Sequence, residues 1–230
     1  MFLRNMIVAA AAALMLASTT PVLQAQFAGT GPRDDFRDTT ILRPPTGSKV
    51  AIIVFEDLGC PACARAHPIE KQVAEQYHVP LVRYDFPLAQ HVWTFEGAVD
   101  ARYLQDKVSP KLADEYRSAV FVAQMSISSK DDLRQFTEHW MQQHGQKLPA
   151  VVDPGGALAA KVQADYDLGK RLNVEYTPTL VVVTRNNYQV VGGTAEGTND
   201  PTKLAGVVEG AIAQTKTASA AHGSHAVAHR

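Results

Sequence analysis

Two cysteines separated by two residues are the feature of this sequence most able to do chemistry. Cys60 and Cys63 are the only cysteines among 230 residues, and they enclose Pro61 and Ala62. A disulfide that closes so short a loop removes little entropy from the unfolded chain, so it would add little stability. Two neighbouring thiols can, however, form and break a disulfide reversibly. We therefore expect the pair to carry out thiol–disulfide exchange.

The predicted surroundings of the pair favour a reactive first thiol. The β-branched run at residues 50–55 predicts a buried strand, and a helix is expected to begin at Pro61, where the missing N–H costs nothing. Cys60 would then lie at a helix N-terminus, where free N–H groups and the helix dipole lower a thiol pKa from about 8.5 to about 3.5–7.5. Cys60 is the expected nucleophile. Cys63, one turn further, would resolve the mixed disulfide.

Metal binding is the main alternative interpretation of the same residues. Cys60, Cys63 and His67 form a C-x-x-C-x-x-x-H pattern, and thiolate and imidazole ligands suit zinc or copper. A structural zinc site usually needs four protein ligands, and no second ligand pair lies nearby in the sequence. We therefore expect no metal and a partly exposed His67, with an inert disulfide as a further alternative.

A second signal lies far downstream, at Thr177 and Pro178. These residues precede a β-branched run at 179–183, which predicts an antiparallel hairpin with residues 188–191. A proline that enters a strand gives up a hydrogen-bond donor of the ladder, and a cis peptide bond would explain its presence. Residues 80–86 predict one more strand, since their apolar residues alternate.

Helical periodicity dominates the region between residues 91 and 161. Ser109 stands before Pro110, which is typical of an N-cap followed by proline at the first helical position. Ser129 and Asp132 resemble a capping box. These signals predict a set of helices inserted between the strands.

The two ends of the chain carry different signals. Residues 1–25 predict a secretory signal peptide, with basic Arg4, an apolar run of about a dozen residues and Ala25 before the cut. That run is shorter than the roughly 20 residues that span a bilayer, so we expect a soluble exported protein without stable membrane insertion, an uncleaved anchor being the alternative. Residues 26–48 predict an N-terminal arm.

The last helix is predicted from Asp200, and the Ala-, Ser- and His-rich residues 216–230 predict a disordered tail. Histidines in this tail could bind a metal weakly, although such tails are typically solvated. The tail histidines are His222, His225 and His229. Since 22 basic residues balance 23 acidic residues, the charge indicates no nucleic-acid partner.

From these motifs the chain resembles the DsbA-like branch of thioredoxin-fold disulfide oxidoreductases. The matching stretches are FEDLGCPACARAHP, YDFPLAQH and VEYTPTLVVV. The resemblance covers residues 49–215 and implies an α/β thioredoxin-like fold with a helical subdomain inserted at about 91–161. It implies that Cys60 is the nucleophile, that Cys63 resolves, and that a cis Pro178 lies beside the disulfide. It also implies that Pro68 kinks the helix.

Two departures from the family pattern bear on mechanism. Many relatives carry a buried acid six residues before the first cysteine, where this chain has Val54. Glu56 and Asp57 are the candidates to replace it, and strand alternation puts Glu56 on the face of Val54. Strongly oxidising relatives have His where this chain has Ala62, which implies a milder oxidant. His91 matches a histidine of several relatives, with an expected structural role.

The function implied is that of a periplasmic, or otherwise exported, oxidase of reduced polypeptides. An extended substrate would pair with the backbone beside Thr177 and Pro178, and a quinone-linked membrane partner would reoxidise the enzyme. No cofactor is implied. Thr177 and Ala62 leave open a reductase or isomerase kept reduced by a membrane donor. The isomerase version is less expected, since no stretch of this sequence predicts a dimerisation domain. A non-catalytic metal-binding or chaperone-like module is the alternative from another class.

Overall fold

A computed structural model describes residues 42–191 and 203–225, with side chains as far as residue 216. Its sheet has four strands in the order β2-β1-β3-β4. Strand β1 pairs with β2 in parallel and with β3 in antiparallel orientation, and β3 pairs with β4 in antiparallel orientation. The strands are β1 (Val50–Glu56), β2 (Leu81–Asp85), β3 (Thr179–Thr184) and β4 (Tyr188–Val190). All four agree with the strands predicted from the sequence to within two residues.

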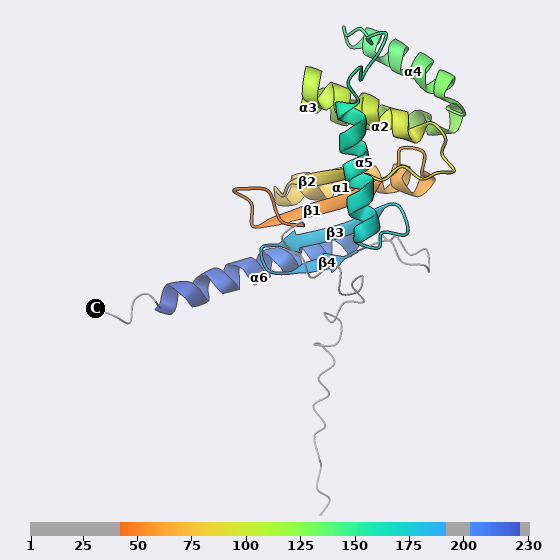
Figure 1. The fold of residues 1–230 in the computed structure, drawn as a ribbon. Coiled ribbons are helices and arrows are strands. Elements are labelled where there is room, and N and C mark those ends of the chain that lie inside the picture. The colour runs from red at the N-terminus through yellow and green to blue at the C-terminus, as the bar shows by residue number, and fades with distance from the viewer. Residues whose placement is uncertain (1–41, 192–202, 226–230) are drawn as a thin grey trace, which may run out of the picture.

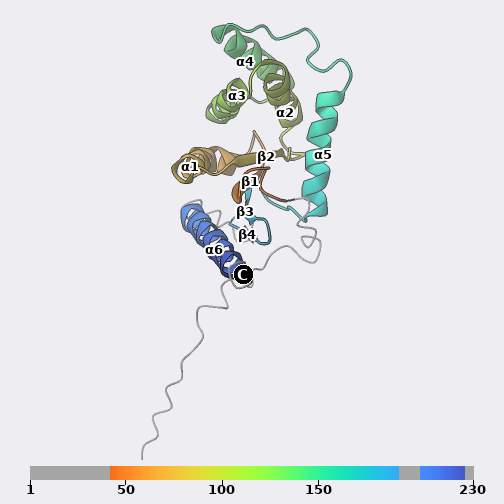
Figure 2. The ribbon, with the colours of Figure 1, turned by 90° about the vertical axis from the view of Figure 1, so that its left-hand side faces the viewer.

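Strand β1 is buried along its whole length because helices cover both faces of the sheet. Helices α1 (Pro61–Tyr77) and α6 (Lys203–His225) lie on one face, and α5 (Ala157–Arg171) lies on the other (Figure 2). Ile52 accordingly packs with residues of α1 and α6, and Ile53 packs with residues of α5. This two-sided burial is why β1 is a continuous apolar run.

A separate helical layer packs beyond the carboxyl end of β1 and is connected to the sheet by α5 (Figure 1). Ser109 accepts a hydrogen bond from the backbone of Leu112, and Ser129 accepts one from Asp132, so both predicted N-caps are confirmed. The layer is formed by α2 (Thr94–Tyr103), a π-helical turn (Leu104–Val108), α3 (Pro110–Ala123), a 3₁₀ turn (Gln124–Ser126) and α4 (Lys130–Gln143).

Helix α5 approaches the sheet closely at Gly169. A Cβ atom at this position would lie 2.6 Å from the ring of Phe86, so only glycine fits. Phe86 in turn stacks on Tyr166 of the same helix. This contact anchors α5 against the residue that follows β2.

The C-terminal helix is longer than the sequence analysis predicted. Helix α6 continues to His225, whereas an unstructured tail was expected from Lys216. Alanine has the highest intrinsic helix propensity, and three alanines in residues 216–221 favour a helix without an apolar face.

The predicted signal peptide, most of the N-terminal arm and residues 226–230 lie outside the described residues. None of the helices in the described ranges combines the length and the apolar character needed to cross a bilayer.

Candidate active site

The two cysteines lie at the start of α1, as the sequence predicted. Cys60 is the N-cap residue with extended backbone angles, and Pro61 is the first residue of the helix. Both cysteines are free thiols. Both are buried, but Cys60 is 7% exposed and Cys63 is 1% exposed, so Cys60 is the less shielded of the two.

The two thiols differ sharply in acidity. A hydrogen bond from the Cys63 thiol is the main cause that lowers the pKa of Cys60 to about 6, against an opposing contribution from burial, and backbone N–H groups of Cys63 and Ala62 lower it further. Burial raises the pKa of Cys63, and the neighbouring Cys60 raises it further. Near neutral pH, Cys60 is therefore the thiolate and Cys63 keeps its proton.

The segment before β3 meets the cysteines from the other side. The Cys60 sulfur lies 3.3 Å from the carbonyl oxygen of Thr177, 117 residues away in sequence. The Thr177–Pro178 bond is cis, as predicted, and both residues are buried. The structure thus brings together Cys60, Thr177 and Pro178, which sequence analysis linked only through the order of motifs.

Asp57 organises the loop that carries Cys60. Its buried carboxylate accepts hydrogen bonds from the backbone N–H groups of Gly59 and Leu88 and from Nδ1 of His91, all at 2.7–2.8 Å. A Cβ atom at Gly59 would lie 2.7 Å from Thr94, so this position requires glycine. Asp57 and His91 therefore fix the shape of the loop, in agreement with the structural role expected for His91.

Gln124 braces the same loop from the helical layer and was not identified from the sequence. Its buried side-chain amide donates to the carbonyl oxygen of Leu58 at 3.0 Å and to that of Cys60 at 3.4 Å. A lone glutamine after an amphipathic helix gives no signal of such a role, because its partners lie more than 60 residues away.

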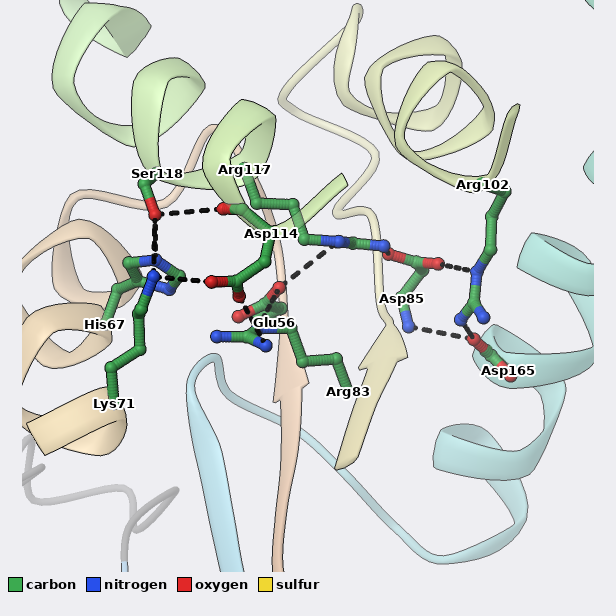
Figure 3. A network of polar contacts seen from close by, with 10 residues as sticks. All are labelled: Glu56, His67, Lys71, Arg83, Asp85, Arg102, Asp114, Arg117, Ser118 and Asp165. Carbon is green, nitrogen blue, oxygen red and sulfur yellow. Dashed lines mark hydrogen bonds and ion pairs between the residues drawn. The ribbon is translucent and has the colours of Figure 1, made fainter. Parts of the chain in front are cut away.

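A network of ion pairs joins the helical layer to the last residues of β1 and β2 (Figure 3). Arg117 of α3 bridges Glu56 of β1 at 3.1 Å and Asp85 of β2 at 2.7 Å. Arg83 also lies against Glu56, and Arg102 joins Asp85 to α5. The network ties the helical layer to the sheet at the carboxyl ends of β1 and β2.

His67 is buried rather than partly exposed, which corrects the sequence-based expectation. It is 4% exposed because α3 covers this face of α1, and its ring packs on Phe121 while Nε2 lies 2.8 Å from the hydroxyl of Ser118. Burial, with a smaller contribution from Arg83, lowers the pKa of His67 to about 3, so the imidazole is neutral.

The geometry does not support the C-x-x-C-x-x-x-H metal alternative. Within the described ranges, the one group of side chains close enough to share an ion joins His67 to Glu56 and Glu70, without either cysteine. Arg83 and Arg117 lie against Glu56 in this group. Two guanidinium groups supply the positive charge that a metal ion would otherwise provide.

Glu70 is the unpaired acid of this buried cluster. It is 1% exposed, and one of its carboxyl oxygens has no hydrogen-bond partner among the described residues. Burial, reinforced by the charge of Glu56, raises the pKa of Glu70 to about 8. Glu70 therefore carries a proton at neutral pH.

Three exposed apolar residues are next in sequence to residues that contact Cys60 or its loop. Val92 follows His91, Met125 follows Gln124, and Tyr176 precedes Thr177; their exposed fractions are 59%, 85% and 40%. Each is thus the sequence neighbour of a residue that contacts the loop or the sulfur of Cys60.

Several solved structures, among them a thiol–disulfide exchange protein, have a similar fold. The thiol-disulfide exchange protein alpha-DsbA2 from Wolbachia pipientis matches with a TM-score of 0.57 and 17% identity, over 76% of this chain and 90% of that one. BdbD from Bacillus subtilis matches with 0.57 and 15%, over 74% and 91%. ScsC from Proteus mirabilis matches with 0.58 and 16%, over 84% and 86%.

A comparison with curated protein sequences gave no match. The model of the thioredoxin family, in contrast, matches residues 38–191, which include the reactive pair and the whole sheet. With its thioredoxin-like α/β sheet and DsbA-like helical layer, the chain belongs to the thioredoxin family.

Proposed function

We propose that this protein is an exported thiol–disulfide oxidoreductase that oxidises reduced polypeptides through Cys60 and Cys63. The observation that carries the proposal is the difference in acidity within the pair: the pKa of the less shielded Cys60 is lowered, and the pKa of the more deeply buried Cys63 is raised. A thiolate is the nucleophile of disulfide exchange, and a low pKa also makes a thiol a good leaving group.

The reaction begins with the disulfide form of the enzyme. A substrate thiolate attacks the sulfur of Cys60, the Cys60–Cys63 bond breaks, and Cys63 leaves with the electron pair as a thiolate. A second substrate thiolate then attacks the substrate sulfur of the mixed disulfide, and Cys60 leaves as a thiolate. The substrate has gained a disulfide and the enzyme holds two reduced cysteines.

The departing Cys63 thiolate needs a proton because its pKa is raised. The charge of nearby Glu56 contributes to the raised pKa of Cys63. Carboxyl oxygens of Glu56 and Glu70 lie within 4.8 Å of each other in the buried cluster. The acids of the network are each paired with a lysine or arginine, whereas no ion pair is formed by Glu70 among the described residues, which leaves its neutral carboxyl as the proton store. We infer that the proton passes from Glu70 through Glu56 to Cys63. The two glutamates would thus replace the buried acid that many relatives carry at the position of Val54.

The stabilised thiolate of Cys60 favours the reduced form of the enzyme, which makes the disulfide form an oxidant. An outside acceptor must then reoxidise the pair, and a quinone-linked membrane protein has the required chemistry. An extended substrate would pair with the backbone beside Thr177 and Pro178, with its apolar side chains on Val92, Met125 and Tyr176. Export rests on the signal-like residues 1–25.

The reduction potential of the pair against glutathione tests the direction of the reaction. We expect a value closer to about −120 mV, as for strong oxidants, than to about −270 mV, as for thioredoxin. The second value would instead support the reductase or isomerase alternative.

A Cys60→Ser variant tests whether turnover occurs at all. It should lose all oxidation of a reduced polypeptide, since no mixed disulfide can form at residue 60. Full activity of this variant in preventing polypeptide aggregation, with no exchange by the wild type, would support a chaperone-like module in place of an enzyme.

A further inference from the structure

A cavity of about 420 Å³ lies in the helical layer, away from the cysteines. It is bounded by α2, by the first turn of α4 and by the segment that leads into α5. None of the residues that line it is a cysteine, Thr177 or Pro178. The volume is within the range of about 300–1,000 Å³ that is typical of small-molecule sites.

The walls of the cavity are largely apolar. Their inner surface is provided by Phe95 and Val99 of α2, Leu133 of α4, and Leu148 and Val152 of the following loop. Val99, Leu133 and Leu148 are buried core residues, so these walls are fixed in place by the packing of the helices. A rigid apolar wall suits a compact apolar ligand body.

Asp100 supplies the buried polar group of this cavity. It lines the cavity, is 8% exposed and accepts a hydrogen bond from the hydroxyl of Thr137 at 3.2 Å. Thr137 in turn bonds to the buried Tyr116 hydroxyl. In the described part of the chain, no cationic side chain forms an ion pair with Asp100.

The basic residues at the rim are already engaged by other acids. Lys130 pairs with Glu96, and Arg134 pairs with Glu138. The carboxylate of Asp153 is used to cap α5, where it accepts from the backbone N–H groups at the start of the helix. Asp100 is thus a buried acid of the cavity without an ion-pair partner in the described part of the chain, although the positive charge of Arg134 acts on it from α4.

An asparagine would accept the Thr137 hydrogen bond without the cost of burying a charge-bearing group. An acid at this position is therefore better explained by a positively charged ligand than by packing. We propose that the cavity binds a small organic cation, an ammonium group on an apolar body, with the carboxylate of Asp100 as its anchor. This site is independent of disulfide exchange.

The charged and titratable groups around Asp100 define how binding depends on pH. Glu96 faces it from its own helix, Tyr116 from α3, and Arg134 from α4. Burial is the main cause that raises the pKa of Asp100 to about 7. An alkylammonium, like lysine, titrates near pH 10, so binding should strengthen as Asp100 ionises between about pH 6 and 8.

The test compares 2-phenylethylammonium with the neutral 2-phenylethanol, each titrated into the full chain by calorimetry at pH 8 and pH 6. We expect the ammonium to bind at least about tenfold more tightly than the alcohol at pH 8, and the preference to shrink at pH 6. Asp100→Asn should remove the preference while it leaves the fold and the weak binding of the alcohol intact.

Two further variants separate this outcome from a change in folding. Ala159→Phe, which fills the cavity from α5, should abolish binding of both probes, whereas Asp131→Asn at the exposed rim should change affinity by less than about threefold. The proposal is overturned if the ammonium does not bind saturably at pH 8, or if the wild type and Asp100→Asn bind it equally. Disulfide exchange measured alongside should be unaffected in every variant.

Discussion

Arg117 of α3 and Glu56 of β1 form a buried ion pair, with 3.1 Å between Nη1 and Oε1, 61 residues apart in sequence. Arg117 also holds Asp85 through its second terminal nitrogen. One guanidinium thus binds the helical layer to the last residues of two strands, β1 and β2 (Figure 3). The negative charge of Asp85 and Glu56 raises the pKa of Arg117 above its ordinary value, so the side chain stays charged despite its burial.

Replacement of Arg117 by methionine should therefore be strongly destabilising. The change leaves the buried carboxylates of Glu56 and Asp85 with less compensating positive charge. Loss of one partner of a buried ion pair lowers the free energy of unfolding by about 3–5 kcal/mol. Urea unfolding of the purified protein measures this loss. The control is Arg134→Met, which removes a half-exposed pair with Glu138 and should cost less than about 1 kcal/mol. Equal losses for both variants would show that the buried network contributes nothing particular to stability.

The two thiols should be modified at very different rates. Iodoacetamide should label Cys60 of the reduced protein with a pH midpoint near 6, because the pKa of this thiol is lowered to about 6. Cys63 should remain largely unlabelled up to pH 8, because burial raises its pKa and shields its sulfur. Peptide mass spectrometry separates the two positions after digestion. Similar labelling rates at both positions would exclude the proposed division of roles.

Glu70 should make the folded protein less stable as the pH rises. Its pKa is raised from 4.5 to about 8 in the folded state, so above pH 4.5 the unfolded chain releases a proton that the folded chain retains. The stability that is fully present below pH 4.5 is therefore lost as the pH rises toward 8. Glu70→Gln cannot ionise and should escape this loss.

The free energy of unfolding, measured from pH 5 to pH 9, tests this linkage. Wild type and Glu70→Gln should diverge with increasing pH, with the variant more stable by about 1–3 kcal/mol at pH 8. Glu75→Gln on the exposed face of the same helix should follow the wild type. Parallel curves for wild type and Glu70→Gln would mean that Glu70 is ionised in the folded protein.

Local patterns were enough to predict the main elements and the reactive pair. The β-branched run of β1, the proline after Cys60 and the serine N-caps act through neighbouring residues, so a single sequence reveals them. Contacts between elements that are far apart in the sequence cannot be predicted from such local patterns. The burial of His67 depends on α3, which covers α1 only after the chain has folded, and a pattern with helical periods does not specify which helix packs on which.

The acidic residues near the two cysteines show the same limit of prediction from the sequence. Strand alternation put Glu56 on the face of Val54, and it is buried there, but its partners Arg83 and Arg117 could not be found from spacing. Asp57 was considered for proton transfer, whereas the structure uses both of its oxygens to hold the loop. The hydrogen bonds of the Gln124 amide gave no sequence signal, because their acceptors are backbone carbonyl groups rather than particular side chains.

Gln124 should position Cys60 although it does not touch the sulfur. Its amide donates to the carbonyl oxygens of Leu58 and Cys60, and so it holds the loop against the first turn of α1. In Gln124→Ala both carbonyl groups lose this donor, which should cost about 1–3 kcal/mol in stability. The looser loop should also align the N–H groups of α1 less well with the Cys60 thiolate. The labelling midpoint of Cys60 should then move from near pH 6 toward the ordinary value of about 8.5.

The pH profile of labelling distinguishes a positioning role from a purely structural one. Gln124→Glu keeps the shape of the side chain but turns an acceptor toward two carbonyl oxygens, so it should shift the midpoint at least as far as Gln124→Ala. Gln142→Ala, at an exposed position of α4, is the control and should leave both stability and midpoint unchanged. If Gln124→Ala loses stability while its labelling midpoint stays near pH 6, then the brace supports only the fold, and the acidity of Cys60 depends on Cys63 and the helix N-terminus alone.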